Sequence, residues 1–453
     1  MSESTPDNAS PRHDPLAALR QPNFLLFTSS RTFYGIGVTM LQTVMLWQVY
    51  EISDSPLALG LTGLARLIPS LIFTLIGGAA ADSYNRRNIV LATQTVPIVC
   101  GVVLALATID GWVTLGLIYG LVVAMGVAAS FEGPARVAIL PAIVRPETFA
   151  NAVTVTSTLQ SFAFVAGPAL GGIFIAVIGV GGSYGVFVAL AIMSVLTMAL
   201  LRYVEPPKGA GGVTIAAIKE GVVFVRANQV LLGAMALDMF AVIFGGVKAL
   251  LPIYASDILE VGPKGFGLLN ASFEIGAFLM SFVLLVRPPT ERSGRALIWA
   301  VVIFGAVTVL FGFSRNFYLS LVLYALIGAS DMISVVMRST TIQLATPDAL
   351  RGRVSAVNQV FIQSSNQMNT LYSGIVASVT NATFAVVSGG FGTLFTVGLI
   401  GWRLPKLYSY RIPKGGVVKS EATKPAEEEE PPSSDGTGPT GKAKPEETPS
   451  AAP

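Results

Sequence analysis

The sequence predicts an all-α membrane protein that crosses the bilayer twelve times. Three observations predict this fold: the chain has few charged residues, its apolar residues form long blocks, and its basic residues are unevenly distributed between those blocks. Only 12% of the 453 residues are charged and 52% are hydrophobic, whereas a soluble globular domain carries about 25% charged residues. The apolar residues form continuous blocks, which favours helices over the alternating strands of a barrel. Lipid is therefore the expected solvent.

Twelve segments reach the length of about 20 residues that a helix needs to cross a bilayer. The expected spans are 24–50, 58–81, 88–108, 113–131, 150–177, 184–203, 231–253, 267–285, 296–313, 318–336, 354–379 and 382–402. They divide the chain into a cytoplasmic N-terminal segment (1–23), a six-helix bundle (24–203), a cytoplasmic central loop (204–230), a second six-helix bundle (231–404) and a polar, disordered cytoplasmic tail (405–453). A short amphipathic helix is expected near 215–225.

The basic residues fix the orientation of these spans. With the N-terminus placed in the cytoplasm, 24 of the 29 lysines and arginines fall in cytoplasmic segments, two fall in outer loops and three lie within spans. Cytoplasmic loops carry an excess of Lys and Arg. Both termini are therefore expected in the cytoplasm, and the chain is expected in the inner (plasma) membrane.

The two halves repeat at an offset of 207 residues. The matched pairs are Phe33 and Phe240, Gly60 and Gly267, and Leu61 and Leu268. Further along, the offset shortens by five or six residues, and Arg136 then matches Arg338. Two parallel six-helix repeats are one way in which transporter folds are assembled.

The scarcity of Cys and His excludes several kinds of site. Cys100 is the one cysteine and His13 the one histidine, so neither a disulfide nor a Cys/His metal cluster can form within one chain. A proton carrier inside the membrane would therefore be a carboxylate. The chain is not expected to be an enzyme or to hold a cofactor or metal, because no nucleophile–base pair and no phosphate-binding glycine loop is visible.

The loop after the second span resembles a signature of the major facilitator superfamily, G-x-x-x-D-R-x-x-R-R. The matching residues are Gly78, Asp82, Arg86 and Arg87, with Ser83 where the family has arginine. In that superfamily the loop lies against the start of the eleventh helix when the protein is closed to the cytoplasm. The resemblance therefore implies a gate formed by these four residues and Arg353, beside the start of the eleventh span.

The fifth span resembles the G-P-x-x-G-G core of a motif of exporters in the same superfamily, through Gly167, Pro168, Gly171 and Gly172. Proline removes a backbone hydrogen bond and glycine permits close helix packing. Together with further blocks around Arg136 and Arg338, this resembles the subgroup that includes the enterobactin exporter and macrolide efflux proteins. The arginine of the drug–proton antiporter motif is absent, because Val122 stands near its place.

Charged residues within the spans are costly and therefore mark candidate sites. The carboxylates Asp238, Glu274 and Asp331 are candidates for proton coupling, and Arg31 and Arg66 are candidates for ion pairs. Arg31 and Asp238 lie at matching places in their spans under the repeat. The alternative to a functional role is that these charges form static pairs, such as Arg31 with Asp238, that only fix helix packing.

Two further charges are expected at the membrane surfaces, and one polar stripe is expected inside. Glu132 ends the fourth span and is expected at the interface, while Lys248 is expected to reach outward.

The polar stripe in the eleventh span consists of Gln359, Gln363, Asn366, Gln367 and Thr370. Their spacing of three or four residues predicts one helix face. That face is expected to line a wet cavity; a hydrogen-bonded seam between helices is the alternative.

The resemblance implies a secondary active transporter that exports a lipophilic or amphipathic small molecule, of the siderophore or drug class, by alternating access and proton antiport. Two alternatives stay open: proton-coupled metabolite uptake, and a non-transporting membrane sensor or binding protein on the same fold. The expected partners are the small-molecule substrate, protons and the lipid bilayer, with no nucleic acid. The chain is expected to act as a monomer.

Overall fold

The computed structural model describes residues 17–204, 215–286, 293–347 and 350–410. Over these residues the chain is helical and contains no β-strand. Nine helices of the described part are long and apolar enough to cross a membrane, by length and composition alone. Most of the predicted N-terminal segment, part of the central loop and nearly all of the tail lie outside the described residues.

Most helix ends lie within a few residues of the predicted spans, but the helix of the fourth span continues to Ile143 rather than 131, and that of the tenth span to Ala345 rather than 336. The helices are α1 (Pro22–Ser53), α2 (Pro56–Ser83), α3 (Arg86–Ile109), α4 (Leu115–Ile143), α5 (Phe149–Ala199), α6 (Ile215–Ala227), α7 (Gln229–Gly245), α8 (Leu251–Ile253), α9 (Gly262–Val286), α10 (Ser293–Phe313), α11 (Phe317–Ala345), α12 (Arg351–Val379), α13 (Ala382–Arg403) and α14 (Pro405–Ser409). Several begin at a side-chain cap. Asn85, Thr114, Asn228, Asn316 and Asn381 each accept a hydrogen bond from a backbone N–H of the first turn, which otherwise has no helical partner.

The longest helical run, α5, is interrupted at Gly179, where the predicted fifth and sixth spans meet. Gly179 has a φ of 74° and a ψ of 176°, a conformation that favours glycine. The run contains 51 residues, and a straight helix of that length would measure about 77 Å at 1.5 Å per residue. The hydrocarbon core is about 30 Å thick, so a turn at Gly179 divides the run into two lengths that each fit a bilayer.

The seventh span differs from its prediction as one helix over 231–253. Helix α7 ends at Gly245, and a 3-10 turn over Lys248–Leu250, the short α8 and a π turn over Tyr254–Ile258 follow. The break occurs at a Gly-Gly pair, where helix propensity is low. The Asn369 side chain on α12 donates to the carbonyl oxygens of Ile243 and Gly246, at 3.0 and 3.1 Å. This amide therefore satisfies backbone groups that the break would otherwise leave without partners.

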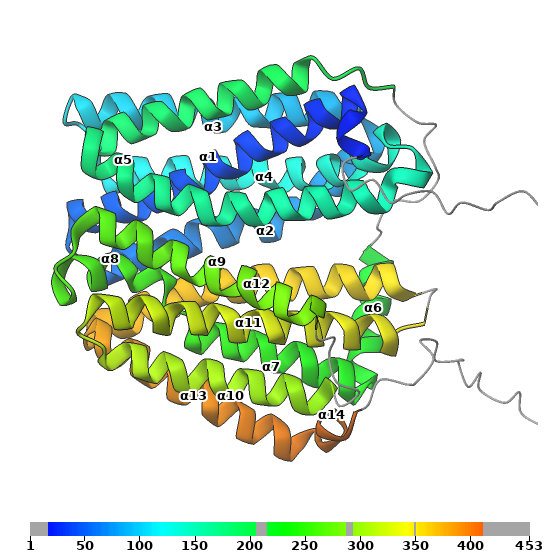
Figure 1. Cartoon of the computed structure of the whole chain (residues 1–453), viewed down its shortest axis with the longest axis vertical. Helices are drawn as coiled ribbons and strands as arrows, with labels where there is room; N and C mark the ends of the chain where they lie inside the picture. The colour runs from blue at the N-terminus through cyan, green and yellow to red at the C-terminus, as the bar shows by residue number, and fades with distance from the viewer. Residues whose placement is uncertain (1–16, 205–214, 287–292, 348–349, 411–453) are drawn as a thin grey trace, which may run out of the picture. The chain divides into compact units, whose positions relative to one another are not determined.

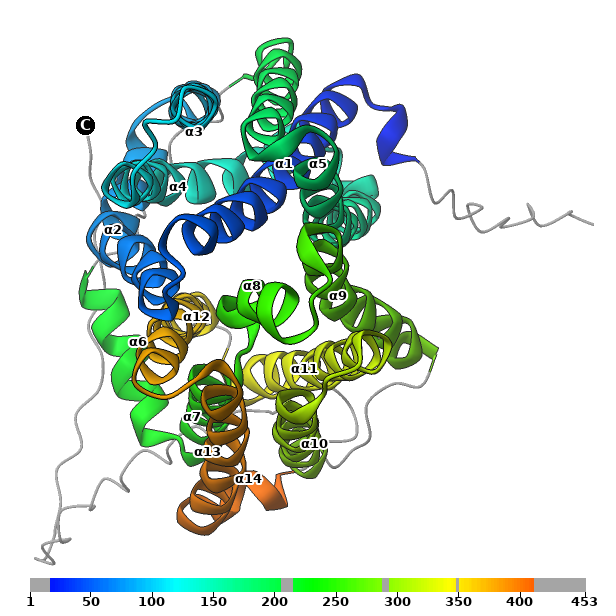
Figure 2. The same cartoon turned by 90° about the vertical axis from the view of Figure 1, so that its left-hand side faces the viewer.

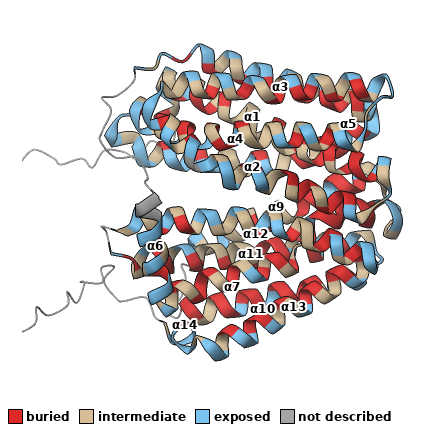
Figure 3. Ribbon diagram, turned by 180° about the vertical axis from the view of Figure 1, so that it is seen from behind, coloured by how far each residue is buried: buried red, intermediate tan, exposed pale blue. Residues whose placement is uncertain are grey.

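The helices pack in two groups, which Figure 1 and Figure 2 show one above the other. Helices α1–α5 contact one another, and α7 and α9–α13 do likewise, with α6 lying against α7 and α12. The main contacts between the groups are those of α2 with α12 and of α5 with α9. Buried residues are dense around α8 and α9, near these contacts, whereas many residues on the outward faces of the helices are exposed (Figure 3).

Two glycine pairs bring the backbones of the two groups together. A Cβ on Gly60 would lie 3.0 Å from the Cα of Gly374, and a Cβ on Gly172 would lie 2.7 Å from the Cα of Gly267. Both contacts lie at the end of the molecule where α1 ends and α2 begins, away from the start of α1. Such close backbone approach requires small residues.

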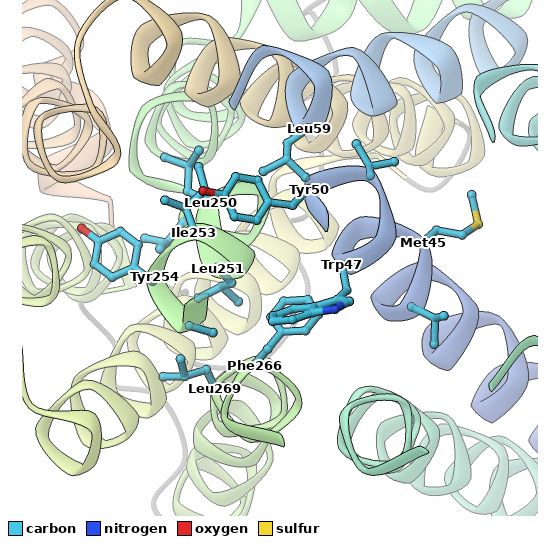
Figure 4. Packing of buried hydrophobic residues seen from close by; sticks show 14 of the residues in the cluster. Met45, Trp47, Tyr50, Leu59, Leu250, Leu251, Ile253, Tyr254, Phe266 and Leu269 are labelled. Carbon is cyan, nitrogen blue, oxygen red and sulfur yellow. The ribbon is translucent and has the colours of Figure 1, made fainter. Parts of the chain in front are cut away.

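Aromatic side chains complete the same closed end (Figure 4). The rings of Trp47 and Phe266 lie 5.5 Å apart between centroids, and the Tyr50 hydroxyl donates to the Asp257 carboxylate. Leu59 is fully buried in this cluster, near Tyr50 and Leu250. We call this set of contacts the closed end.

Replacing Gly172 with alanine is expected to loosen the closed end. The new Cβ would meet the Pro263 carbonyl oxygen at 2.6 Å, and overpacking of this kind costs about 1–3 kcal/mol. In a protein with Cys100 replaced by serine and Leu59 by cysteine, Gly172→Ala should speed the reaction of that cysteine with a water-soluble maleimide. Gly185→Ala is the matched control, because a Cβ there meets nothing within 4 Å. Equal rates in the two variants would show that the Gly172 contact does not hold the end shut.

Candidate functional site

A cavity of about 120 Å³ lies between the two helix groups, beside the closed end. It is lined by both groups: the residues are Thr39, Gln42, Thr43, Met45, Leu46, Thr62, Arg66, Val122, Phe164, Pro168, Lys248, Ala249, Asn270, Glu274, Gln367 and Thr370. The Asn270 amide on α9 donates to the Thr43 hydroxyl on α1 at 3.3 Å, so one hydrogen bond crosses between the groups at this wall. We call this the first cavity.

A second cavity, of about 220 Å³, lies among α7, α9, α11 and α12. Its polar lining consists of Asp238, Lys248, Asn270, Glu274, Tyr324, Asp331, Arg338, Ser365, Asn366 and Asn369. Lys248, Asn270 and Glu274 line both cavities. The two cavities therefore adjoin at a lysine, an amide and a carboxylate, and most of the charged side chains that the sequence places within spans meet here.

The static pair of Arg31 with Asp238, named above as an example of the alternative, is not the pairing that the structure forms. Asp238 pairs instead with Arg338 on α11, at 2.9 Å between Oδ2 and Nη1, and both side chains are buried. Arg31 donates from Nε to the Gln160 amide oxygen on α5, at 3.2 Å. Each residue finds its partner inside its own helix group.

The interfacial placements expected for Glu132 and Lys248 are wrong. Glu132 is only 4% exposed and pairs with Arg136, one turn along α4, while it also accepts from the Gln94 amide. The Arg136 guanidinium in turn lies 5.0 Å from the centre of the Tyr34 ring. Lys248 faces the two cavities rather than the outer membrane surface, because the break after Gly245 turns this segment inward.

The three carboxylates proposed for proton coupling all line the second cavity, but their surroundings differ. Asp238 is held by Arg338. Asp331 and Glu274 form no ion pair or hydrogen bond within the part of the chain that the structure describes, and both are partly exposed to the cavity. Within the described residues, Asp238 is therefore the one carboxylate of the three that pairs with a cation.

The polar stripe on α12 divides along its length. Gln367 and Thr370 line the first cavity, and Asn366 lines the second. Gln359 and Gln363, nearer the start of α12, are exposed and line neither cavity. Phe361 lies elsewhere on the helix and packs against the apolar cluster of Val225, Leu231 and their neighbours.

The glycines of the fifth-span motif lie at helix contacts. A Cβ on Gly167 would lie 1.9 Å from the Thr39 hydroxyl oxygen on α1, and a Cβ on Gly171 would lie 3.3 Å from the Met40 carbonyl oxygen. Gly172 makes the contact with Gly267 at the closed end, and Pro168 lines the first cavity. The motif thus joins α5 to α1, to the other helix group and to the cavity wall.

The expected gate residues are not brought together in this structure. Asp82 is exposed at the end of α2, near Gly78, whose Cβ would meet nothing within 4 Å. Arg87 donates to the carbonyl oxygens of Met198 and Ala199, at 3.4 and 2.5 Å, and Arg86 to those of Ala81 and Ala138, at 3.3 and 3.4 Å. Arg353 pairs with Glu220 on α6. Both loop arginines therefore secure helix ends within α1–α5.

Several lining residues escaped the sequence analysis. Lys248 faces the cavities because the span breaks at the preceding Gly-Gly pair, which is a recognised sequence signal for a break. Thr39, Gln42 and Asn270 carry no motif, and short polar residues are common in membrane helices. Only the packing of the helices identifies them as cavity residues.

Comparison with known proteins relates this arrangement to membrane transporters. A family described as transmembrane secretion effector matches residues 13–427. The enterobactin exporter EntS of Escherichia coli O127:H6 (strain E2348/69 / EPEC) is 23% identical over 388 residues, which is 86% of this chain and 91% of the relative. The same exporter from Escherichia fergusonii is also 23% identical, over the same shares of the two chains.

Solved structures of transporters share the fold at low sequence identity. A bacterial homologue of the human lysosomal transporter Spinster, in an inward-facing and unoccupied conformation, has a TM-score of 0.66 at 15% identity and covers 87% of this chain and 97% of its own. The nucleoside transporter NupG has a TM-score of 0.63 at 11% identity, with 85% and 99% covered. The chain therefore belongs to the transmembrane secretion effectors of the major facilitator superfamily, and is a membrane transporter rather than an enzyme.

Proposed function

We propose that this chain exports an amphipathic small molecule across the inner (plasma) membrane by alternating access, in exchange for protons. The observation that carries the proposal is a charged cavity between two helix groups, which adjoins a second charged cavity within one of them and lies beside the tight glycine contacts of the closed end. The similarity to the enterobactin exporter favours export over uptake. It also favours transport over a purely sensory role on the same fold.

The proposal includes twelve membrane-spanning helices in two parallel repeats, over 24–203 and 231–404. The spans are α1–α4, the two parts of α5, α7 with its following turns, and α9–α13. The closed end supports the repeat. Gly60 matches Gly267 at the first offset, and Gly172 matches Gly374 at the shorter offset that relates Arg136 to Arg338. The two glycine contacts are then copies of each other, as a twofold relation between the halves requires.

The orientation follows from the basic residues. With both termini in the cytoplasm, the closed end faces outward, and this conformation would receive substrate from the cytoplasm. Tyr50 and Asp257, which hydrogen-bond across the closed end, are separated by 207 residues and are thus also repeat partners. A monomer suffices for this mechanism, because both cavities are built within one chain.

The gate proposed at the cytoplasmic end would form in the opposite conformation. Asp82 would then approach the start of α12, where an anionic side chain near a helix N-terminus gains about 0.3–1 kcal/mol. Arg353 would exchange Glu220 for Asp82, while Gly78, Arg86 and Arg87 would keep the loop in place. A shift of about 1.4 kcal/mol changes a two-state ratio tenfold, so even this modest contact can bias the equilibrium.

Proton coupling is proposed for Glu274 and Asp331 ahead of Asp238. Glu274 lines both cavities, so its charge faces whatever occupies them. Asp238 has its charge compensated by Arg338, and removing one partner of a buried pair chiefly destabilises a protein, by about 3–5 kcal/mol. Asp238 is therefore assigned a mainly structural role, with Arg31 stabilising the other half through Gln160.

The cavity-lining positions of α12 should be reached by water from the cytoplasmic side. In a Cys100→Ser background, a cysteine at Asn366 or Gln367 should react with a membrane-impermeant thiol reagent applied to inside-out vesicles. A cysteine at Phe361 is the control on the same helix, because that side chain packs in an apolar cluster. Similar reaction rates at all three positions would contradict a wet cavity.

Glu274→Gln should abolish proton-driven export while leaving the folded protein and substrate binding measurable. The substrate for this test is the compound that a deletion strain retains and the complemented strain releases, identified by metabolite profiling. Purified protein in proteoliposomes should concentrate this compound against its gradient when a proton gradient is imposed. Glu51→Gln, which removes an exposed carboxylate at the end of α1, is the matched control.

The outcomes of this experiment separate the candidate functions. Proton-driven flux in the opposite direction would indicate uptake, and binding without flux would indicate a sensor or binding protein. Undiminished coupling in Glu274→Gln and in Asp331→Asn would place the proton site outside this pair.

A further inference from the structure

The first cavity contains a cation that the protein does not neutralise. Arg66 lines this cavity from α2, one turn beyond Thr62, which lines it as well. Arg66 forms no hydrogen bond and no ion pair within the described chain, although its side chain is only partly exposed. By contrast, Arg31, Arg136 and Arg338 each bind a side chain of a neighbouring residue. Since an unpaired charge within a membrane is costly, this exception calls for a function.

The charges of the two cavities are distributed unequally. The first cavity has two cations, Arg66 and Lys248, and one carboxylate, Glu274. The second has three carboxylates, Asp238, Asp331 and Glu274, and two cations, Arg338 and Lys248. Lys248 and Glu274 lie at the junction and can balance each other. What remains is an excess positive charge at Arg66 and an excess negative charge at Asp331, on opposite sides of that junction.

The rest of the first cavity fits an amphipathic molecule. Hydroxyl and amide groups of Thr39, Gln42 and Gln367 can donate and accept hydrogen bonds, while Leu46, Val122 and Phe164 offer apolar surface. Small-molecule sites commonly have volumes of about 300–1,000 Å³, and each cavity alone is smaller than that. A substrate of this size would therefore occupy both cavities, with its ends in opposite electrostatic surroundings.

From these observations we infer that the transported molecule is an amphipathic organic anion, and that Arg66 binds its anionic group in the first cavity. This inference rests on the proposed function, since it names the substrate class for the same site. A guanidinium offers a planar set of donors that matches a carboxylate, and the nearby hydroxyl and amide groups can bind its remaining lone pairs. The part of the molecule that reaches Asp331 carries no negative charge, because that end of the site is already anionic.

Binding of a matched acid and ester tests the inference directly. The probes are dansylglycine and its methyl ester, which differ in charge but little in size, together with 1-pyrenebutyrate and its methyl ester. Fluorescence titration of the purified full-length protein in detergent should show saturable binding of the acids, about tenfold or more tighter than of the esters. Loss of a charge-assisted hydrogen bond accounts for a factor of this size.

Variants distinguish a bound anion from general attraction to a cationic protein. Arg66→Gln should reduce the acid-to-ester preference to within about twofold, and Arg66→Lys should retain part of it, because the charge stays while the planar geometry is lost. Arg31→Gln is the matched control: it removes an arginine from the same helix group that lines neither cavity. It should leave the preference unchanged.

Three results would overturn the inference: no saturable binding of either acid, equal binding of acid and ester, or a preference that survives in Arg66→Gln. These failures are separate from those of the proposed function. Proton-driven export of neutral or cationic compounds would leave transport standing and overturn the anion site. An Arg66-dependent acid preference without proton-driven flux would leave the site standing and overturn transport.

Discussion

The direct backbone contact of two helix pairs, α2 with α12 and α5 with α9, is the constraint on which the site depends. Glycine at both members of each pair allows an approach that any side chain would prevent. The aromatic and carboxylate contacts around Trp47 and Tyr50 add to the seal at the same end. The first cavity, which both groups line, lies beside this seal.

The break in the seventh span gives these cavities their polar character. In an unbroken helix, the backbone carbonyl groups of this segment would accept hydrogen bonds from N–H groups one turn further along the helix, and Lys248 would lie nearer the membrane surface. The Gly245–Gly246 pair ends the helix early, and Asn369 takes over two of the released carbonyl groups. Lys248 then lies at the junction of both cavities, next to Glu274. One amide on α12 thus stabilises the irregular backbone that shapes the site, which is tolerated within a membrane only where it lines a cavity or is covered by protein.

Much of the fold could be predicted from the sequence, because span length and apolar continuity depend on local composition alone. The cost of a charge within a span also singles out Asp238, Glu274, Asp331 and Arg66, which all line a cavity. Their partners could not be predicted. Pairing depends on the rotation of each helix about its axis, which the sequence pattern of a nearly uniform apolar helix leaves undetermined. Arg31 and Asp238 each bind within their own helix group, although they lie 207 residues apart at matching places in the proposed repeat.

Alternating access about the closed end is the central claim, and paired distance measurements by spin labelling in lipid nanodiscs test it most directly. One label pair replaces Tyr84 and Gly352, at the exposed ends of α2 and α12 near the proposed gate, and the other replaces Leu57 and Val379 at the opposite ends. Each label pair is predicted to show a longer-distance and a shorter-distance population, and a shift toward the longer distance at one pair should accompany a shift toward the shorter distance at the other. Asp82→Asn should favour the longer distance between Tyr84 and Gly352 and the shorter distance between Leu57 and Val379. A single distance at both pairs, unchanged by Asp82→Asn and by a proton gradient, would contradict this claim.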